Sequence, residues 1–169
     1  MIHIYTGDGK GKTTAAAGLA VRALGAGLRV FFAQFIKDGS SSEIVFLKEK
    51  APGKFIYASH GRGKFILGKP SDEDIRLARK TLDSLEEALR SSQYGLVVAD
   101  EIFGAWKAGL FPLGPLLGLM RIPCGETELV LTGRDAPPEA VALADLVTEM
   151  KCVKHYYSKG RPPQRGIEM

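Results

Sequence analysis

Short runs of apolar and β-branched residues alternate along the chain with longer stretches in which apolar residues recur at helical spacing. The short runs predict strands at residues 2–6, 28–35, 54–59, 95–100, 127–133 and 146–153. The periodic stretches predict helices at residues 12–27, 41–50, 71–92, 112–120 and 137–144. Ser71 and Asp74 have the spacing of a capping box at the start of the longest helix.

Strands that alternate with crossover helices are typical of an α/β protein whose mainly parallel sheet is covered by helices on both faces. Right-handed crossovers place the loops that follow the strands at the same edge of such a sheet. The residues just after strand ends are therefore the ones to search for chemistry. Since no linker, repeat or low-complexity tract divides the sequence, we expect residues 1–169 to form one domain.

Apolar residues make up 45% of the chain and charged residues 25%, the proportions of a globular protein. No apolar run approaches the roughly 20 residues of a membrane-spanning helix, so no membrane partner is expected. The first residues lead straight into strand-like sequence, without the pattern of a signal or transit peptide. Cys124 and Cys152 form no C-x-x-C motif, which argues against a structural disulfide or zinc site and predicts a cytoplasmic protein.

The net charge is +4, from 23 basic and 19 acidic residues. Opposite charges are interleaved along most of the sequence, and only residues 151–165 concentrate basic side chains. A nucleic-acid-binding protein would be expected to have a basic patch with aromatic residues among its lysines and arginines. We therefore expect an anionic small ligand and no nucleic-acid partner.

A glycine-rich loop, G-D-G-K-G-K-T-T, joins the first predicted strand to the first predicted helix and ends like a phosphate-binding loop. Gly7 lies one residue closer to Gly11 than the pattern G-x-x-x-x-G-K-[ST] requires. Backbone N–H groups and the positive helix end would bind phosphates, Lys12 would contact phosphate oxygens, and Thr13 would hold Mg²⁺. The residues expected around the nucleotide are Gly7, Asp8, Gly9, Lys10, Gly11, Lys12, Thr13 and Thr14. A plain glycine turn before an alanine-rich helix is the alternative.

Two acidic residues, Asp100 and Glu101, follow an apolar strand. This is the layout of a Walker-B segment, in which a carboxylate supports Mg²⁺ directly or through water. We expect the pair to meet Thr13 across neighbouring strands; a solvated pair of acids at a strand end is the alternative. Together with the loop, the pair predicts ATP binding in a RecA-like P-loop fold.

The other titratable residues do not indicate a kinase or a hydrolase, because no motif of an acceptor-activating aspartate stands out. Arg134 follows the strand at residues 127–133, where it would reach the phosphates or form a salt bridge at the rim. His60 and His155 are the remaining candidates, and a lone histidine is more typical of a rim or cap residue than of a catalyst.

Several segments occur together in an order and spacing that resemble one family. They are residues 7–27, 30–37, 97–102, 131–137 and 144–155, and the ending Q-R-G-I-E-M resembles that family's carboxyl-terminal signature. From Ile2 to Glu168 the chain resembles the P-loop type of ATP:cob(I)alamin adenosyltransferase, the CobA or BtuR family. The resemblance implies attack of Co(I) of a reduced corrinoid on C5′ of ATP, with release of triphosphate.

The resemblance also implies roles for individual residues. In this family a similarly shortened loop binds ATP in the reverse direction, so that C5′ rather than the γ-phosphorus faces the reaction partner. Lys12, Thr13 and Glu101 would stabilise the leaving triphosphate, Thr13 and Glu101 through Mg²⁺, for which Mn²⁺ is the alternative. Glu101 rather than Asp100 matches the family's metal-contacting glutamate, and Arg22 matches a family arginine near the nucleotide.

Residues 61–74 correspond to the loop that wedges aromatic side chains beneath the corrin ring in this family. Phe65 stands where one aromatic is expected, but Leu67 occupies the place of the usual tryptophan. Leucine offers less area than an aromatic ring, so this departure concerns the preferred corrinoid and the reduction of Co(II). A flavoprotein electron donor and a homodimer are further implications of the resemblance.

Two other functions fit parts of the pattern. A conventional P-loop NTPase or kinase would transfer the γ-phosphoryl group, and the short loop and missing acceptor motif argue against it. A RecA-like ATP-dependent partner of nucleic acid would bind with a steep salt dependence, and the interleaved charges argue against it.

Overall fold

The computed structural model describes residues 1–37, 39–61, 63, 68–156 and 160–167. Its strands are β1 (Ile2–Thr6), β2 (Val30–Gln34), β3 (Phe55–Ser59), β4 (Leu96–Asp100), β5 (Glu128–Thr132) and β6 (Leu146–Glu149). Its helices are α1 (Lys12–Gly25), α2 (Ser42–Lys50), α3 (Asp72–Arg90), α4 (Ile102–Lys107), α5 (Leu113–Met120) and α6 (Pro138–Leu143). Among these described elements the sequence pattern missed α4, whose six residues are too few to show a helical period.

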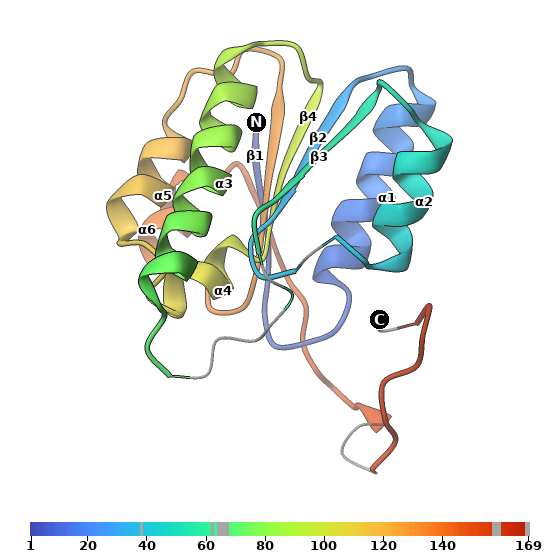
Figure 1. The fold of residues 1–169 in the computed structure, drawn as a ribbon, viewed down its shortest axis with the longest axis vertical. Coiled ribbons are helices and arrows are strands. Elements are labelled where there is room, and N and C mark those ends of the chain that lie inside the picture. Colours follow the sequence, from blue (N-terminus) through green and yellow to red (C-terminus); the bar gives the residue numbers. More distant parts are fainter. Residues whose placement is uncertain (38, 62, 64–67, 157–159, 168–169) are drawn as a thin grey trace.

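The strands form one sheet in the order β3-β2-β4-β5-β1-β6, and each described pairing is parallel. Helices α1 and α2 cover one face of the sheet, and α3, α5 and α6 cover the other (Figure 1). The predicted α/β architecture with a parallel, helix-covered sheet is therefore confirmed. Since all strands run the same way, their carboxyl ends meet at one edge, the lower edge in Figure 1.

Two apolar clusters attach the helices to the sheet, one on each face. Ala16 and Ala20 of α1 pack with Phe32 and Val98 on one side, and their small side chains let the helix lie close to the strands. On the other side Leu85 of α3 lies in the second cluster together with residues of β4 and β5. Along β4 the two faces alternate, and because both are covered, all five of its residues are buried.

Helix α3 begins as its sequence predicts. The Ser71 hydroxyl accepts a hydrogen bond from the Asp74 N–H at 3.2 Å, and the Ser71 N–H donates to the Asp74 carboxylate at 3.0 Å.

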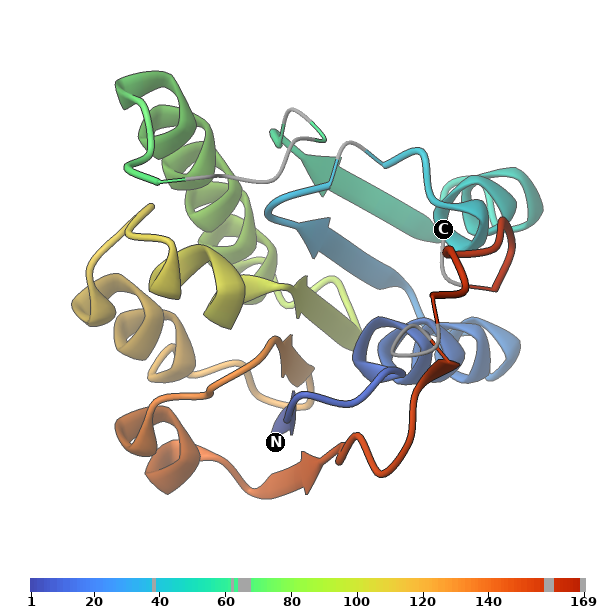
Figure 2. The ribbon, with the colours of Figure 1, turned by 90° about the horizontal axis from the view of Figure 1, so that it is seen from below.

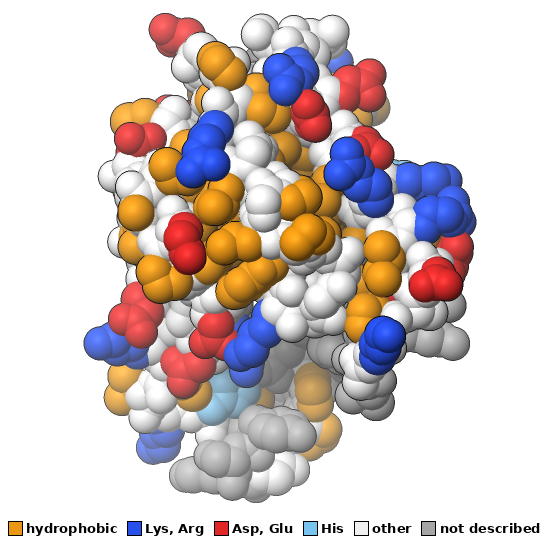
Figure 3. Space-filling view, turned by 90° about the vertical axis from the view of Figure 1, so that its left-hand side faces the viewer, with side chains coloured by type: hydrophobic (Ala, Val, Ile, Leu, Met, Phe, Trp, Pro, Cys, Tyr) orange, Lys and Arg blue, Asp and Glu red, His pale blue; other side chains and the backbone are white. Residues whose placement is uncertain are grey.

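The outer face of the layer formed by α3, α5 and α6 carries both acidic and basic side chains among apolar atoms (Figure 3). Ion pairs on α3 contribute to this mixture: Arg76 with Glu73, Arg79 with Asp83, and Arg90 with Glu86.

Two expectations about strands are wrong. The last strand ends at Glu149 rather than at residue 153, because the chain leaves the sheet edge there and turns onto the loop after β1. Strands β1 and β4 are not neighbours, because β5 lies between them. The second difference changes how the candidate site is assembled.

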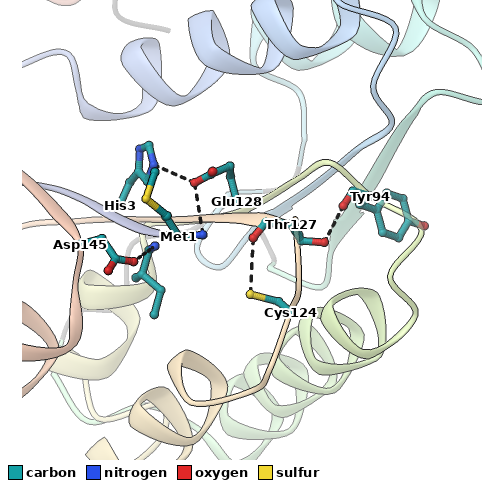
Figure 4. A network of polar contacts seen from close by, with 8 residues as sticks. Met1, His3, Tyr94, Cys124, Thr127, Glu128 and Asp145 are labelled. Atoms are coloured by element: carbon teal, nitrogen blue, oxygen red, sulfur yellow. Dashed lines mark hydrogen bonds and ion pairs between the residues drawn. The ribbon is translucent and has the colours of Figure 1, made fainter.

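The opposite, amino edge of the sheet is held together by polar contacts around the start of β1 (Figure 4). Glu128 Oε2 lies 3.0 Å from His3 Nε2 and 3.5 Å from the amino group of Met1. The Ile2 N–H donates to the Asp145 carboxylate at 2.7 Å. These contacts fix β1 at the end remote from the glycine-rich loop.

In the part of the chain that the structure describes, no helix is both long enough and apolar enough to cross a lipid bilayer. Cys124 and Cys152 are free thiols.

Candidate active site

The candidate site lies at the carboxyl edge of the sheet, where the glycine-rich loop leads from β1 into α1 (Figure 2). Helix α1 starts at Lys12, its N-cap is Gly11, and its first turn reads K-T-T-A. The N-cap therefore has no side chain to pair with the first N–H groups of the helix. Such a helix start carries about half a positive charge and binds anions. The loop thus has the local geometry that a phosphate site needs.

Lys12 is folded into this loop instead of extending into solvent. Its Nζ donates to the carbonyl oxygens of Gly7 and Gly9, at 2.8 Å each, and the residue is 6% exposed. Burial lowers the pKa of Lys12; the charge of Glu101 opposes this shift and that of Arg134 adds to it. Phosphate oxygens are charged acceptors and would be stronger partners for the ammonium group than two neutral carbonyls.

The residues after β6 lie directly on the loop. The Gly9 N–H donates to the Met150 carbonyl at 2.7 Å, and the Cys152 N–H donates to the Asp8 carboxylate at 3.2 Å. A Cβ added to Gly7 would lie 2.4 Å from the Met150 carbonyl oxygen, and one added to Gly9 would lie 2.7 Å from it. Glycine is therefore required at both positions, because two segments of the main chain are in contact there. Asp8, which we expected near the nucleotide, instead accepts this hydrogen bond from the segment that follows β6.

Asp100 is the centre of a buried hydrogen-bond network. The residue is fully buried at the end of β4. Its Oδ1 accepts from the Thr132 hydroxyl at 2.7 Å, and its Oδ2 accepts from Gln34 Nε2 at 2.8 Å and from the Thr13 hydroxyl at 3.2 Å. These donors compensate the carboxylate for the water that burial removes.

Thr13 meets Asp100 across β5, so the expected contact across neighbouring strands is wrong in its geometry although the two side chains do meet. Thr13 reaches over because it projects from the first turn of α1 and not from β1. Thr132 of the intervening β5 joins the network and also accepts the Glu101 N–H at 2.9 Å. Sequence reasoning missed Thr132 and Gln34. Their signal was available: each is a polar residue that ends an apolar strand.

Glu101 begins α4 with a left-handed backbone, at φ 59°. That conformation is unfavourable for a residue with a side chain, and such strain clusters at functional sites. Burial raises the pKa of Glu101 and the charge of Asp100 adds to the shift, while Lys12, Lys37 and Arg134 oppose it. A cation beside this carboxylate would therefore be favourable.

The other predicted residues lie at different distances from this centre. Arg134 is exposed two residues after the end of β5, and its charge acts on both Lys12 and Glu101. Lys10 and Thr14 are exposed on the loop and the first turn of α1. Arg22 instead lies in the last turn of α1, about 15 Å along the helix axis from Lys12, and is not brought to the site within this chain.

The histidine candidates and the corrinoid loop remain to be placed. His60 Nδ1 lies 3.2 Å from the Thr81 hydroxyl of α3, and the ring of His155 lies 4.8 Å from that of Tyr156. Burial, and secondarily the charge of Lys80, lowers the pKa of His60. Phe65 and Leu67 lie outside the described residues.

The oxygens at the site fit a magnesium ion. Because an ionised Asp100 can only accept, the Thr13 hydroxyl must donate its hydrogen there, and its lone pairs stay available to a cation. Hydroxyl and carboxylate oxygens are the hard ligands that Mg²⁺ takes, and it completes its shell with water and substrate phosphates. Among the residues that the structure describes, no three His, Cys, Asp or Glu side chains are grouped as a metal site.

Two solved structures share the fold of this chain. The flagellar accessory protein FlaH from Methanocaldococcus jannaschii matches with a TM-score of 0.57 and 12% identity, over 88% of this chain and 69% of that one. The type III secretion ATPase EscN of enteropathogenic E. coli matches with a TM-score of 0.52 and 16% identity, over 98% of this chain and 46% of that one. The predicted RecA-like P-loop fold is thereby confirmed; at these identities the likeness concerns the fold alone.

Sequence comparisons are more specific. A corrinoid adenosyltransferase of Pseudomonas aeruginosa is 34% identical over 168 residues, which cover 99% of this chain and 83% of that protein. The corrinoid adenosyltransferase of Escherichia coli K12 is 30% identical over 168 residues, 99% of this chain and 85% of that protein. The family model described as ATP:corrinoid adenosyltransferase BtuR/CobO/CobP matches residues 1–169. The chain therefore belongs to the ATP:corrinoid adenosyltransferase family.

Proposed function

We propose that this chain transfers the 5′-deoxyadenosyl group of ATP to Co(I) of cobalamin or a precursor corrinoid and releases inorganic triphosphate. The observation that carries the proposal is the family match over residues 1–169. The site supports it, because a phosphate loop with Lys12 buried at its centre lies beside the two carboxylates Asp100 and Glu101.

The reaction is a single displacement at carbon. The electron pair of Co(I) forms the Co–C5′ bond, the C5′–O5′ bond breaks, and its electron pair leaves on the triphosphate. The cobalt is formally oxidised to Co(III), and no proton moves at the reacting atoms. The protein therefore needs no general base; it must orient C5′, exclude water and stabilise the leaving triphosphate.

Lys12 and the start of α1 are suited to that stabilisation. The Lys12 ammonium is already held at the loop, and the N–H groups of the first turn add the positive end of the helix. Negative charge develops on the triphosphate as C5′–O5′ breaks. Groups that the fold already holds at the loop need little reorganisation at that moment.

Thr13 and Glu101 would hold Mg²⁺, or Mn²⁺ in its place, together with the phosphates. A bound divalent cation supplies further positive charge to the leaving group. Asp100 orients the Thr13 hydroxyl, as its 3.2 Å hydrogen bond supports. Glu101 would gain most from the cation, because burial and the Asp100 charge oppose its ionisation without one.

The remaining roles follow from the resemblance. Phe65 and Leu67 would contact the corrinoid, and Phe65 would help to displace the lower ligand of Co(II) so that a flavoprotein can reduce it. Phe65→Ala should slow the reaction that starts from Co(II) much more than the one that starts from Co(I). Equal losses in the two reactions would contradict this role.

We also propose that residues 1–169 act as one domain, in the cytoplasm and as a homodimer. Free thiols at Cys124 and Cys152 fit a reducing compartment. Arg22, remote from its own loop, is assigned to the nucleotide by the resemblance alone. Light scattering coupled to gel filtration measures the oligomeric state directly; a monomeric mass in the presence of ATP would exclude the dimer.

An anaerobic assay with ATP, Mg²⁺ and chemically reduced cobalamin tests the reaction. We expect light-sensitive adenosylcobalamin and an equal amount of triphosphate. Lys12→Ala and Thr13→Ala should abolish this product, whereas Lys54→Ala, at an exposed lysine before β3, should retain it. ADP and phosphate formed at a rate independent of the corrinoid would instead identify a conventional P-loop NTPase.

A further inference from the structure

We propose that Gln34 and Tyr57 are positioning residues that orient Asp100 and, through it, the metal-binding hydroxyl of Thr13. The observation is a continuous chain of hydrogen bonds from Tyr57 of β3 to Thr13 of α1. This inference rests on the proposed function in one respect only: a divalent cation accompanies the nucleotide at Thr13.

Gln34 lies in the middle of this chain of hydrogen bonds, and its amide can make both contacts in only one orientation. Gln34 is fully buried at the end of β2, and its amide lies between Asp100 and Tyr57. Since an ionised Asp100 only accepts, Gln34 Nε2 must face it, at 2.8 Å. The amide oxygen then faces Tyr57, whose hydroxyl donates to it at 3.0 Å. Tyr57 therefore holds the amide in the orientation in which it donates to Asp100.

Gln34 and Thr13 share the same oxygen of Asp100. Oδ2 receives both donors, whereas Oδ1 receives the Thr132 hydroxyl. If Gln34 no longer donated firmly, the carboxylate could rotate or shift relative to Thr13. The Thr13 hydroxyl would then lose the acceptor that directs its hydrogen inward and its lone pairs toward the cation.

Tyr57 is itself confined on more than one side. Lys48 Nζ of α2 lies 4.0 Å from the ring centroid, a cation–π contact. A Cβ added to Gly39 would lie 2.6 Å from the Tyr57 ring and 2.8 Å from its hydroxyl oxygen. The loop before α2 therefore passes directly against the ring, which only a glycine allows. Tyr57 of the outer strand β3 is in this way held against α2 and the loop before it, and its hydroxyl reaches Asp100 through Gln34.

The test measures binding of Mn²⁺ to the protein–ATP complex by electron paramagnetic resonance, with binding of metal-free ATP measured in parallel. Tyr57→Phe removes one hydroxyl and keeps the ring. Its matched control is Tyr94→Phe, because Tyr94 also packs under a cation, Arg29 at 5.1 Å, but lies before β4 at the opposite edge of the sheet. Gln34→Leu breaks the chain at its middle.

We expect Tyr57→Phe to weaken Mn²⁺ binding about fivefold, the effect of one net hydrogen bond, and Gln34→Leu to weaken it more. Metal-free ATP binding should change by less than about twofold in Tyr57→Phe, and Tyr94→Phe should match the wild type in both measurements. Unchanged Mn²⁺ affinity in Tyr57→Phe, or an equal loss with and without metal, would overturn the inference, and a purely structural role would give the second pattern.

The outcome is separable from that of the proposed function. If the wild type binds Mn²⁺ with ATP and the variants weaken it as expected, the inference holds even if no adenosylated corrinoid is formed. If the wild type forms adenosylcobalamin but binds no Mn²⁺ together with ATP, the inference is wrong and the reaction stands.

Discussion

Replacing Thr132 with valine tests whether the buried network at the end of β4 exists as described. The Thr132 hydroxyl donates to Asp100 Oδ1 at 2.7 Å and accepts the Glu101 N–H at 2.9 Å. Thr132 and Asp100 are both fully buried. Valine has nearly the same shape but offers neither hydrogen bond, so a buried carboxylate loses a donor and a main-chain N–H loses its acceptor.

The expected loss of stability follows from these two contacts. A hydrogen bond to a charged group contributes about 1.5–3 kcal/mol, and one between neutral groups contributes about 0.5–1.5 kcal/mol. Thr132→Val should therefore lower the free energy of unfolding by about 2–4.5 kcal/mol. Thr132→Ser keeps the hydroxyl and removes one buried methyl group, which costs about 1 kcal/mol. For a chain of this size the melting temperature should fall by roughly 2–4 °C per kcal/mol.

Urea unfolding of the wild type and both variants, followed by circular dichroism, measures these differences. We expect the order of stability wild type, Thr132→Ser, Thr132→Val, with the same denaturant slope in all three. If valine proves as stable as serine at this position, the hydroxyl does not pair with Asp100 and Glu101, and the network described around Asp100 is wrong.

Further predictions concern the loop and its neighbouring carboxylate. Gly9→Ala should destabilise the fold by about 2–3 kcal/mol in a thermal melt, because its Cβ would lie 2.7 Å from the Met150 carbonyl and displace a main chain; an unchanged melting temperature would contradict the contact. Burial raises the pKa of Glu101, so the folded state holds that proton more tightly than the unfolded state and loses stability as pH rises through the raised pKa. Glu101→Gln should therefore stabilise the ligand-free protein at neutral pH, with a gain that shrinks as pH falls from the raised pKa to the ordinary glutamate pKa of 4.5 and does not change further below it; melting curves across pH would refute this if the gain stayed constant. Lys12→Met should abolish ATP binding in calorimetry, and retained binding would show that the folded-in ammonium does not serve the phosphates.

The fold could be predicted because its signals are local. Each strand is an apolar run bounded by turn residues, and the capping box at Ser71 correctly predicted the start of the longest helix. What sequence could not give is the order of strands in the sheet. That order depends on which helix packs where, and it placed β5 between β1 and β4 against expectation.

The site was predictable where chemistry follows a motif and was missed where it follows packing. Lys12, Thr13 and the Asp100–Glu101 pair came from spacing and strand context, and the structure brings them together. Gln34 and Thr132 were missed because neither belongs to a motif. Each becomes a partner of Asp100 only once parallel strands align their carboxyl ends.

The shortened phosphate loop is constrained by the segment that follows β6. Gly7, at φ 97°, and Gly9 both abut the main chain of Met150, so their positions are set by the segment that follows β6 as well as by any phosphate. That segment already takes the Gly9 N–H, a donor that would otherwise be free to bind an anion. The donors left to the loop are then those nearer Lys12 and the start of α1. An anion bound by these groups would lie close to Thr13 and to the carboxylates where we propose the cation.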